Sequence, residues 1–132
     1  MRWLAIFGVA VLGGCASSLQ ATSATRPLQL SAEQVKEVHE GVRKALKDPG
    51  SAQFGDLSAA IDDKGLITIC GYVNAKNSYG GFTGHKRYIG MLADSTNAKT
   101  KQRFLAFSVA AMGGAAADDF AVNESCKRAG IS

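Results

Sequence analysis

A short apolar run that ends at a cysteine decides which part of this chain can fold as a domain. Met1-Arg2-Trp3 precedes the run, residues 4–12, and Gly13-Gly14-Cys15 follows it. A positive start, a short apolar stretch and small residues are the layout of a secretory signal. The run is too short to span a membrane as a helix, which takes roughly 20 apolar residues. We therefore assign residues 1–14 to a signal peptide and place the folded part outside the cytoplasm.

The end of this run resembles the lipobox of bacterial lipoproteins, because Leu12-Gly13-Gly14 stands directly before Cys15. The resemblance implies diacylglycerol on the Cys15 sulfur and cleavage between Gly14 and Cys15. Two or three acyl chains hold a protein firmly on a membrane, whereas one chain binds only marginally. Ala16 stands where inner-membrane lipoproteins often carry Asp, and this favours the outer membrane, facing the periplasm. The alternative is an ordinary signal peptide in which Cys15 is incidental.

The rest of the chain divides into a tether and one domain. Residues 15–30 are rich in Ser, Thr and Ala without a steady period, which predicts a lipidated flexible tether. Residues 31–132 are long enough for one small domain, and a composition of 46% hydrophobic and 20% charged residues favours folding over disorder. Loss of residues 1–14 removes only Arg2 among the charged residues, so the net charge of +4 becomes +3. This excess is too small to indicate a nucleic-acid partner.

Two cysteines remain once Cys15 is assigned to lipid. In an oxidising compartment Cys70 and Cys126 are most simply a disulfide. This disulfide would close a loop of nearly 60 residues. In the chain-entropy model, closing such a loop stabilises a fold by roughly 4 kcal/mol. The alternative is a metal or redox pair, but the sequence has no CxxC, and His39 and His85 lack ligand spacing. We expect no metal site and no cofactor.

The pattern of residues 31–132 predicts an α+β fold. Ser31 and Gln34 form a capping-box pattern, and apolar residues then recur at helical spacing until Asp48-Pro49 ends the helix. Four segments have strand character: 54–61, 66–75, 85–93 and 103–110. Residues 115–128 predict a closing helix, which Cys126 would join to segment 66–75. We therefore expect an N-terminal amphipathic helix, an antiparallel meander of three or four strands and a C-terminal helix, with the second sheet face open to solvent.

Segment 74–84, between two of these strands, is unusual in its glycines, asparagines and aromatics. Here the chain resembles a family of small exported bacterial proteins of unknown function. These proteins carry a DPxSAxF element and a CGxVNxKNSYGGxxG element, which correspond to residues 48–54 and 70–84. The resemblance covers roughly residues 31–93 together with a late cysteine, Cys126. It implies a shared fold and export, and no established activity.

Segment 74–84 has two interpretations. In the structural one, glycines provide unusual backbone angles, Asn74 and Asn77 bond the loop's own backbone, and Tyr79 and Phe82 cover the sheet edge. In the functional one, the loop is a recognition surface on a rigid sheet. Its candidate binding residues are Asn74, Lys76, Asn77, Ser78, Tyr79, Gly80, Gly81, Phe82 and Gly84.

Positive charge is concentrated beside this loop, because residues 76–103 contain six cations and one acid. Besides Lys76 these cations form a basic flank: Lys86, Arg87, Lys99, Lys101 and Arg103. Cations often protect a sheet edge from pairing with other chains. The alternative is attraction to anionic envelope material, such as lipid headgroups or peptidoglycan.

No catalytic constellation is visible in the sequence. It has no GxSxG, no HExxH and no cysteine left free as a nucleophile, so we assign no catalytic residue. Our first hypothesis is a membrane-anchored envelope lipoprotein that presents loop 74–84 as a binding or accessory module. The second is a purely structural lipoprotein, and the third is a small envelope hydrolase or an inhibitor of one.

Overall fold

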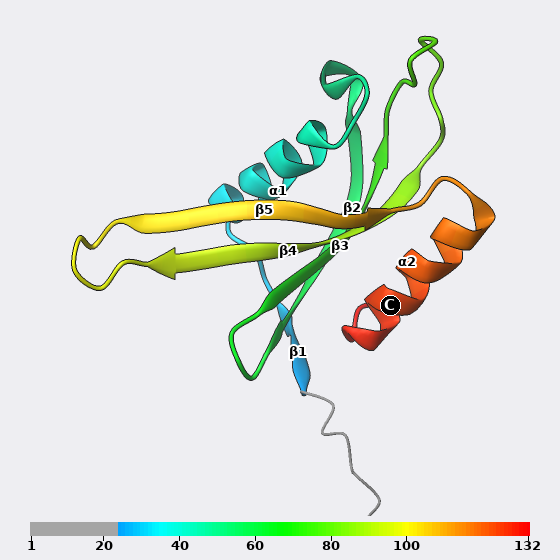
Figure 1. The fold of residues 1–132 in the computed structure, drawn as a ribbon. Coiled ribbons are helices and arrows are strands. Elements are labelled where there is room, and N and C mark those ends of the chain that lie inside the picture. The colour runs from blue at the N-terminus through cyan, green and yellow to red at the C-terminus, as the bar shows by residue number, and fades with distance from the viewer. Residues whose placement is uncertain (1–23) are drawn as a thin grey trace, which may run out of the picture.

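The computed structural model describes residues 24–132, which form a five-stranded antiparallel sheet with two helices (Figure 1). The strands follow one another in the order β1-β2-β3-β4-β5. In chain order the elements are β1 Thr25–Leu28, α1 Ala32–Lys44, a short 3₁₀ helix η1 Pro49–Ser51, β2 Gln53–Asp62, β3 Ile67–Asn74, β4 Lys86–Thr96, β5 Arg103–Met112 and α2 Ala116–Arg128. The predicted α+β class is therefore confirmed. Cys15 and the predicted signal peptide lie outside the described residues.

The strand count is a correction, because the predicted three or four strands omit β1. Residues Thr25–Leu28, which we assigned to the tether, pair with β2 from Asp62 back to Ala59. Their side chains alternate too briefly to show a period. Pro27 also argues against a strand, but proline is tolerated at a sheet edge, where its missing N–H is not needed. Leu28 packs against the main core, so residues 25–28 belong to the folded domain and not to a tether that ends at residue 30.

Helix α1 begins as its capping pattern predicts. The Ser31 hydroxyl accepts a hydrogen bond from the Gln34 amide, and the Gln34 side chain accepts one from the Ser31 amide. Val38 and Val42 are completely buried against the sheet. At Gly41 the helix approaches β5 so closely that an added Cβ would lie 2.6 Å from the Phe107 carbonyl oxygen. Helix α1 therefore covers part of an edge strand, and only glycine fits at the point of contact.

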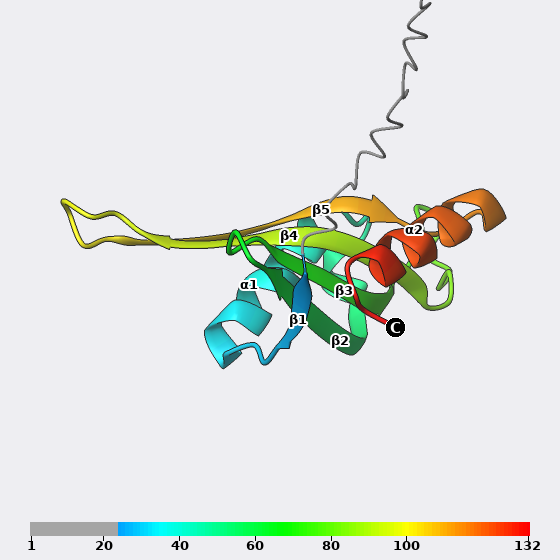
Figure 2. The ribbon, with the colours of Figure 1, turned by 90° about the horizontal axis from the view of Figure 1, so that it is seen from below.

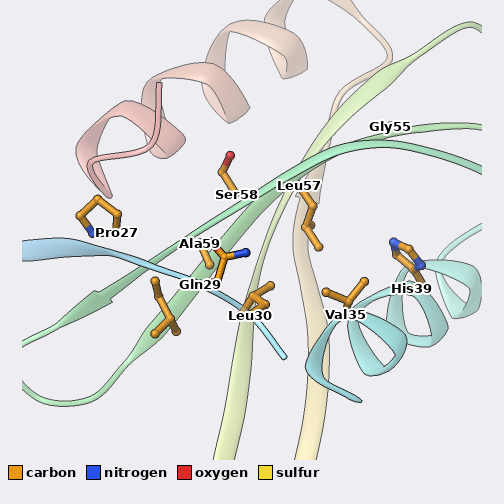
Figure 3. A pocket seen from close by; sticks show the side chains of 10 residues that line it. Pro27, Gln29, Leu30, Val35, His39, Gly55, Leu57, Ser58 and Ala59 are labelled. Atoms are coloured by element: carbon orange, nitrogen blue, oxygen red, sulfur yellow. The ribbon is translucent and has the colours of Figure 1, made fainter. Parts of the chain in front are cut away.

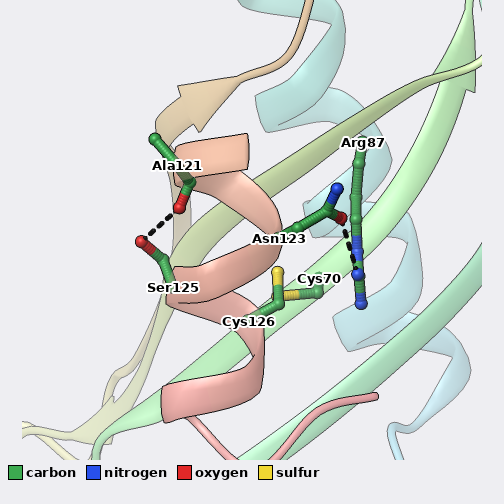
Figure 4. The surroundings of a disulfide bond; sticks show 6 residues. All are labelled: Cys70, Arg87, Ala121, Asn123, Ser125 and Cys126. Atoms are coloured by element: carbon green, nitrogen blue, oxygen red, sulfur yellow. Dashed lines mark hydrogen bonds between the residues drawn. A yellow bond between two sulfur atoms is a disulfide. The ribbon is translucent and has the colours of Figure 1, made fainter. Parts of the chain in front are cut away.

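The two helices lie on opposite faces of the sheet (Figure 2). Alternation along β3 directs Ile69 towards α1 and Cys70 towards α2, because neighbouring residues of a strand face opposite ways. Cys70 and Cys126 form the predicted disulfide, which ties α2 to β3 (Figure 4). The second face is thus covered in part by α2 and is not left fully open to solvent. Val122 and Cys126 are the buried residues of that helix.

Strands β4 and β5 are longer than their sequence patterns predict, and together they form an arm that projects beyond the other strands (Figure 1). Asp94, expected in a connecting loop, lies within β4 opposite Leu105. Arg103 pairs with the carboxylates of Asp94 and Glu33, and the Gln34 side-chain amide donates to Asp94. These bonds join the arm to the first turn of α1.

Candidate functional site

Loop 74–84 joins β3 to β4 at one end of the sheet, while the domain begins at the other end. Thr25 pairs with Asp62, at the end of β2 that leads into the β2–β3 turn. Asn74 pairs with Gln53, at the opposite end of the same two strands. The register therefore separates the start of β1 from the loop by the length of the sheet (Figure 1).

The tip of the loop is held together by Asn77. Its side-chain oxygen accepts hydrogen bonds from the amides of Tyr79, at 2.9 Å, and Gly81, at 3.1 Å. The Asn77 amide donates to the Gly81 carbonyl at 2.8 Å, and the Gly80 amide donates to the Asn77 carbonyl. Gly80 and Gly84 have φ values of 81° and 83°, which other residues rarely adopt. The tip is thus a braced turn in which Asn77 acts as the structural interpretation expects.

The base of the loop is fixed to the segment that follows α1. The Ser51 hydroxyl accepts a hydrogen bond from the Lys76 amide at 2.8 Å and donates one to the Asp48 carbonyl. The Asn74 side chain donates to Gln53, but its own oxygen is buried without a partner. The two sequence elements that carry the family resemblance, residues 48–54 and 70–84, therefore lie in direct contact.

The two aromatic residues of the loop do not cover the sheet edge as the structural interpretation expects. Tyr79 is 96% exposed at the tip, and Phe82 is about half exposed. The Lys76 ammonium lies 5.5 Å from the centre of the Phe82 ring, within the range of a cation–π interaction. Packing accounts for Phe82 in part, but it does not account for Tyr79.

The basic flank does not form a single surface, and this is a correction. Lys86 and Arg87 begin β4 beside the loop, whereas Lys99, Lys101 and Arg103 lie at or beyond its far end. Nine residues of strand, 88–96, separate the two groups, which is about 30 Å. The cations are close in sequence, but a full strand divides them in space.

Two of these cations, Arg87 and Arg103, form hydrogen bonds with other residues of the domain. Arg87 donates to the Asn123 side chain of α2 (Figure 4). Arg87 also lies over the Tyr72 ring. Arg103 hydrogen bonds to Asp94, and this bond holds the pKa of the Asp94 carboxyl below its usual value. Both arginines therefore have structural roles. Lys86 lies beside the loop and has no carboxylate or amide side chain bonded to it among residues 24–132.

Sequence reasoning missed a cavity at the base of the loop, which we call the lysine pocket. It has a volume of about 300 Å³ and lies between the end of α1, the loop and the last residues of β5. Lys47, Lys76 and Lys86 line it together with apolar residues that include Val73, Ala75 and Met112. Lys47 was not among the candidate residues, because nothing local in the sequence relates the end of a helix to a loop between two later strands.

A second cavity, of about 410 Å³, lies between β1, β2 and α1 (Figure 3). Leu30, Val35 and Leu57 line it, and His39 stands at its border. The His39 ring stacks on Phe54 with 3.8 Å between the ring centres. Burial, together with the positive charge of Arg43, lowers the pKa of His39. This environment favours the neutral imidazole.

Within residues 24–132 no cluster of three or more His, Cys, Asp or Glu residues is placed to hold a metal ion. No helix in the same part of the chain has the length and apolarity needed to cross a membrane. Comparison with family models, curated proteins and solved structures gave no match to this chain.

Proposed function

We propose that this chain is a small envelope lipoprotein, anchored by lipid on Cys15, that binds a partner through loop 74–84. The leader and its final Leu-Gly-Gly-Cys support the anchor, and Ala16 supports the outer membrane, facing the periplasm. The position of the loop supports its role, because it lies at the end of the sheet away from Thr25. A tethered domain of this shape presents the loop to an envelope protein, a lipid headgroup or peptidoglycan.

The exposure of Tyr79 is the observation that carries this proposal. Asn77 already satisfies the turn, so the tip does not need the tyrosine ring for its own structure. Tyrosine offers a large contact area with few rotatable bonds and a hydroxyl, and it is enriched in protein interfaces. A braced turn that carries a fully exposed tyrosine is typical of a recognition loop.

Photo-crosslinking in living cells tests the proposal. A photoreactive amino acid in place of Ser78, an exposed neighbour of Tyr79, should capture a defined envelope component. Adding Tyr79→Ala to the same chain should abolish the capture. A photoreactive residue in place of Phe120, which is exposed on α2, is the matched control. Capture that is equal from both positions, or that persists without Tyr79, would contradict a binding role for the loop.

The second candidate is a purely structural lipoprotein, and the hydrogen bonds of Asn77 favour it. The two candidates differ in what Tyr79→Ala does. A structural loop should lose thermal stability in Asn77→Ala and show no further phenotype in Tyr79→Ala. A binding loop should lose its crosslinked partner in Tyr79→Ala while the melting temperature stays unchanged.

A further inference from the structure

The lysine pocket combines three cations with an apolar floor. Lys47 comes from the segment after α1, Lys76 from the loop and Lys86 from the start of β4. Lys76 and Lys86 are partly buried, so their side chains do not simply extend into water. Val73 and Ala75, at the bottom of the pocket, are almost completely buried. Three separate segments thus each contribute a lysine to the wall of one cavity, together with apolar residues.

These lysines lack a counter-ion within the protein. None of the salt bridges among residues 24–132 includes Lys47, Lys76 or Lys86. The residues that line the pocket include no Asp or Glu. A bound anion would therefore meet only positively charged side chains among the ionisable residues of the pocket wall.

The end of α1 does not explain the cluster. Helix C-termini are partially negative and attract cations, which accounts for Lys47 as it accounts for Arg43 and Lys44. Lys76 and Lys86 belong to the loop and to β4, so the end of α1 does not account for them. The Phe82 ring is a partner for the Lys76 ammonium, but it does not account for Lys47 and Lys86 in the wall of the same pocket.

We infer that the lysine pocket binds a small anionic amphiphile, meaning a carboxylate or phosphate attached to a short apolar chain. The anion would lie between the lysines and the apolar part would rest against Val73, Ala75 and Met112. A volume of about 300 Å³ equals that of about ten water molecules, which suits a chain of several carbons. This chemistry is found both in free fatty acids and in anionic lipids, and the experiment separates these sources.

The inference rests on the proposed function only because loop 74–84 forms one wall of the pocket. Tyr79 does not line the pocket, so its replacement separates the two ideas. Tyr79→Ala should abolish crosslinking and leave amphiphile binding unchanged. Lys76→Gln combined with Lys86→Gln should weaken amphiphile binding whether or not the tip recognises a partner.

Octanoate is a suitable probe, and the mature chain with Cys15→Ser and an intact Cys70–Cys126 disulfide is a suitable target. In a titration followed by amide NMR, octanoate should shift the signals of residues 73–77, 86 and 112–113. Acetate has the charge without the chain, and octanol has the chain without the charge. Each should bind at least about tenfold more weakly than octanoate, as expected when one ionic contact or most of the apolar contact is lost.

Lysine substitutions decide whether the pocket is responsible. Lys76→Gln with Lys86→Gln should raise the octanoate Kd about tenfold or more. Lys99→Gln with Lys101→Gln removes the same charge from the tip of the arm and should leave the Kd unchanged. Thermal unfolding shows that each variant remains folded. Equal loss in both pairs would overturn the proposal, as would octanol binding as tightly as octanoate.

A second arm uses vesicles and identifies the source of the ligand. The same unlipidated chain is floated with phosphatidylglycerol vesicles and with phosphatidylcholine vesicles. Flotation with phosphatidylglycerol alone that requires Lys76 and Lys86 supports the pocket and identifies a lipid ligand. Octanoate binding without flotation supports a free acid. If the protein binds neither octanoate nor the vesicles, the inference is overturned.

Discussion

Contact between Gly41 and the backbone of β5 shows how one residue sets the distance between two elements. Glycine is a poor helix former, and alanine at an ordinary helix position would be favoured by about 1 kcal/mol. Here an alanine Cβ would lie 2.6 Å from the Phe107 carbonyl oxygen and 2.7 Å from its ring. The steric cost outweighs the helix propensity, because backbone on one side and a buried ring on the other leave little room to move.

We predict that Gly41→Ala destabilises the domain by about 1–3 kcal/mol, the usual range for overpacking. The melting temperature should fall by several degrees. Gly50→Ala is the control, because a Cβ at residue 50 would meet nothing closer than 3.7 Å. A Gly41→Ala protein as stable as the wild type would show that α1 can move away from β5 at no cost.

His39 makes the stability of the domain depend on pH. Its pKa is lower in the folded protein than the ordinary value near 6.5, first because of burial and then because of Arg43. The unfolded chain therefore binds a proton more readily than the folded chain does. The contribution of His39 is fully present above about pH 6.5 and is lost as the pH falls through the lower folded value.

Urea unfolding at pH 7.5, 6.5 and 5.5 tests this prediction. The free energy of unfolding should fall over this range in the wild type, and His39→Gln should reduce the slope. The Asp94–Arg103 pair acts in a lower pH window, because the depressed pKa of Asp94 keeps that carboxylate charged throughout the range tested. Slopes that are equal in wild type and variant would exclude His39 as the cause.

Among the elements, α2 depends most on a single bond. Its N-cap residue, Ala115, makes no side-chain capping bond, and Val122 and Cys126 are its buried residues. Helix α1 has a full capping box and lies against the main core. The disulfide therefore holds an element whose own packing is slight.

Replacing both Cys70 and Cys126 with Ala should lower the free energy of unfolding by about 2–5 kcal/mol. Amide hydrogen exchange should accelerate more in α2 than in β2 and β3, because the helix loses its tie to the sheet. Cys15→Ser keeps the disulfide and serves as the control. Uniform acceleration across the sheet and both helices would show that α2 is not an independent unit.

Elements whose capping residues and apolar spacing lie within one short segment could be predicted from the sequence. The Ser31 capping box and the buried Val38 and Val42 lie within one helix, and their spacing is sufficient to predict it. Strand β1 has no such local pattern, because four residues that include Pro27 form a strand only by pairing with β2. The end of β4 was missed because polar residues such as Asp94 continue the pairing, and Asp94 bonds to Arg103 of β5 and to Gln34 of α1.

The candidate site was predictable to a similar degree. Glycines and asparagines indicated loop 74–84, and the exported context indicated the disulfide partners. The lysine pocket was not predictable, because it joins Lys47 to Lys76 and Lys86 through tertiary packing alone. The same packing divides the basic flank between two ends of β4, although its members are neighbours in sequence.

For the molecule as a whole, the proposed anchor makes a direct prediction. Cys15→Ser should abolish palmitate labelling and release the protein from membranes. The Cys70 and Cys126 double substitution should leave labelling intact, because neither cysteine carries the lipid in this proposal. A wild-type protein found with its leader uncut, or unlabelled and freely soluble, would remove the basis for the anchored module.

The early start of β1 limits how far an anchored copy can reach. Because the sheet begins at Thr25, nine residues, 16–24, separate it from Cys15. Fully extended, they span about 30 Å, and the eight residues of β3 add about 25 Å to the loop. In the proposed anchored protein, Tyr79 would therefore reach partners within a layer some 50–60 Å deep above the bilayer. A partner fixed in the same membrane would meet it at high local concentration, whereas a more distant one would have to come to it.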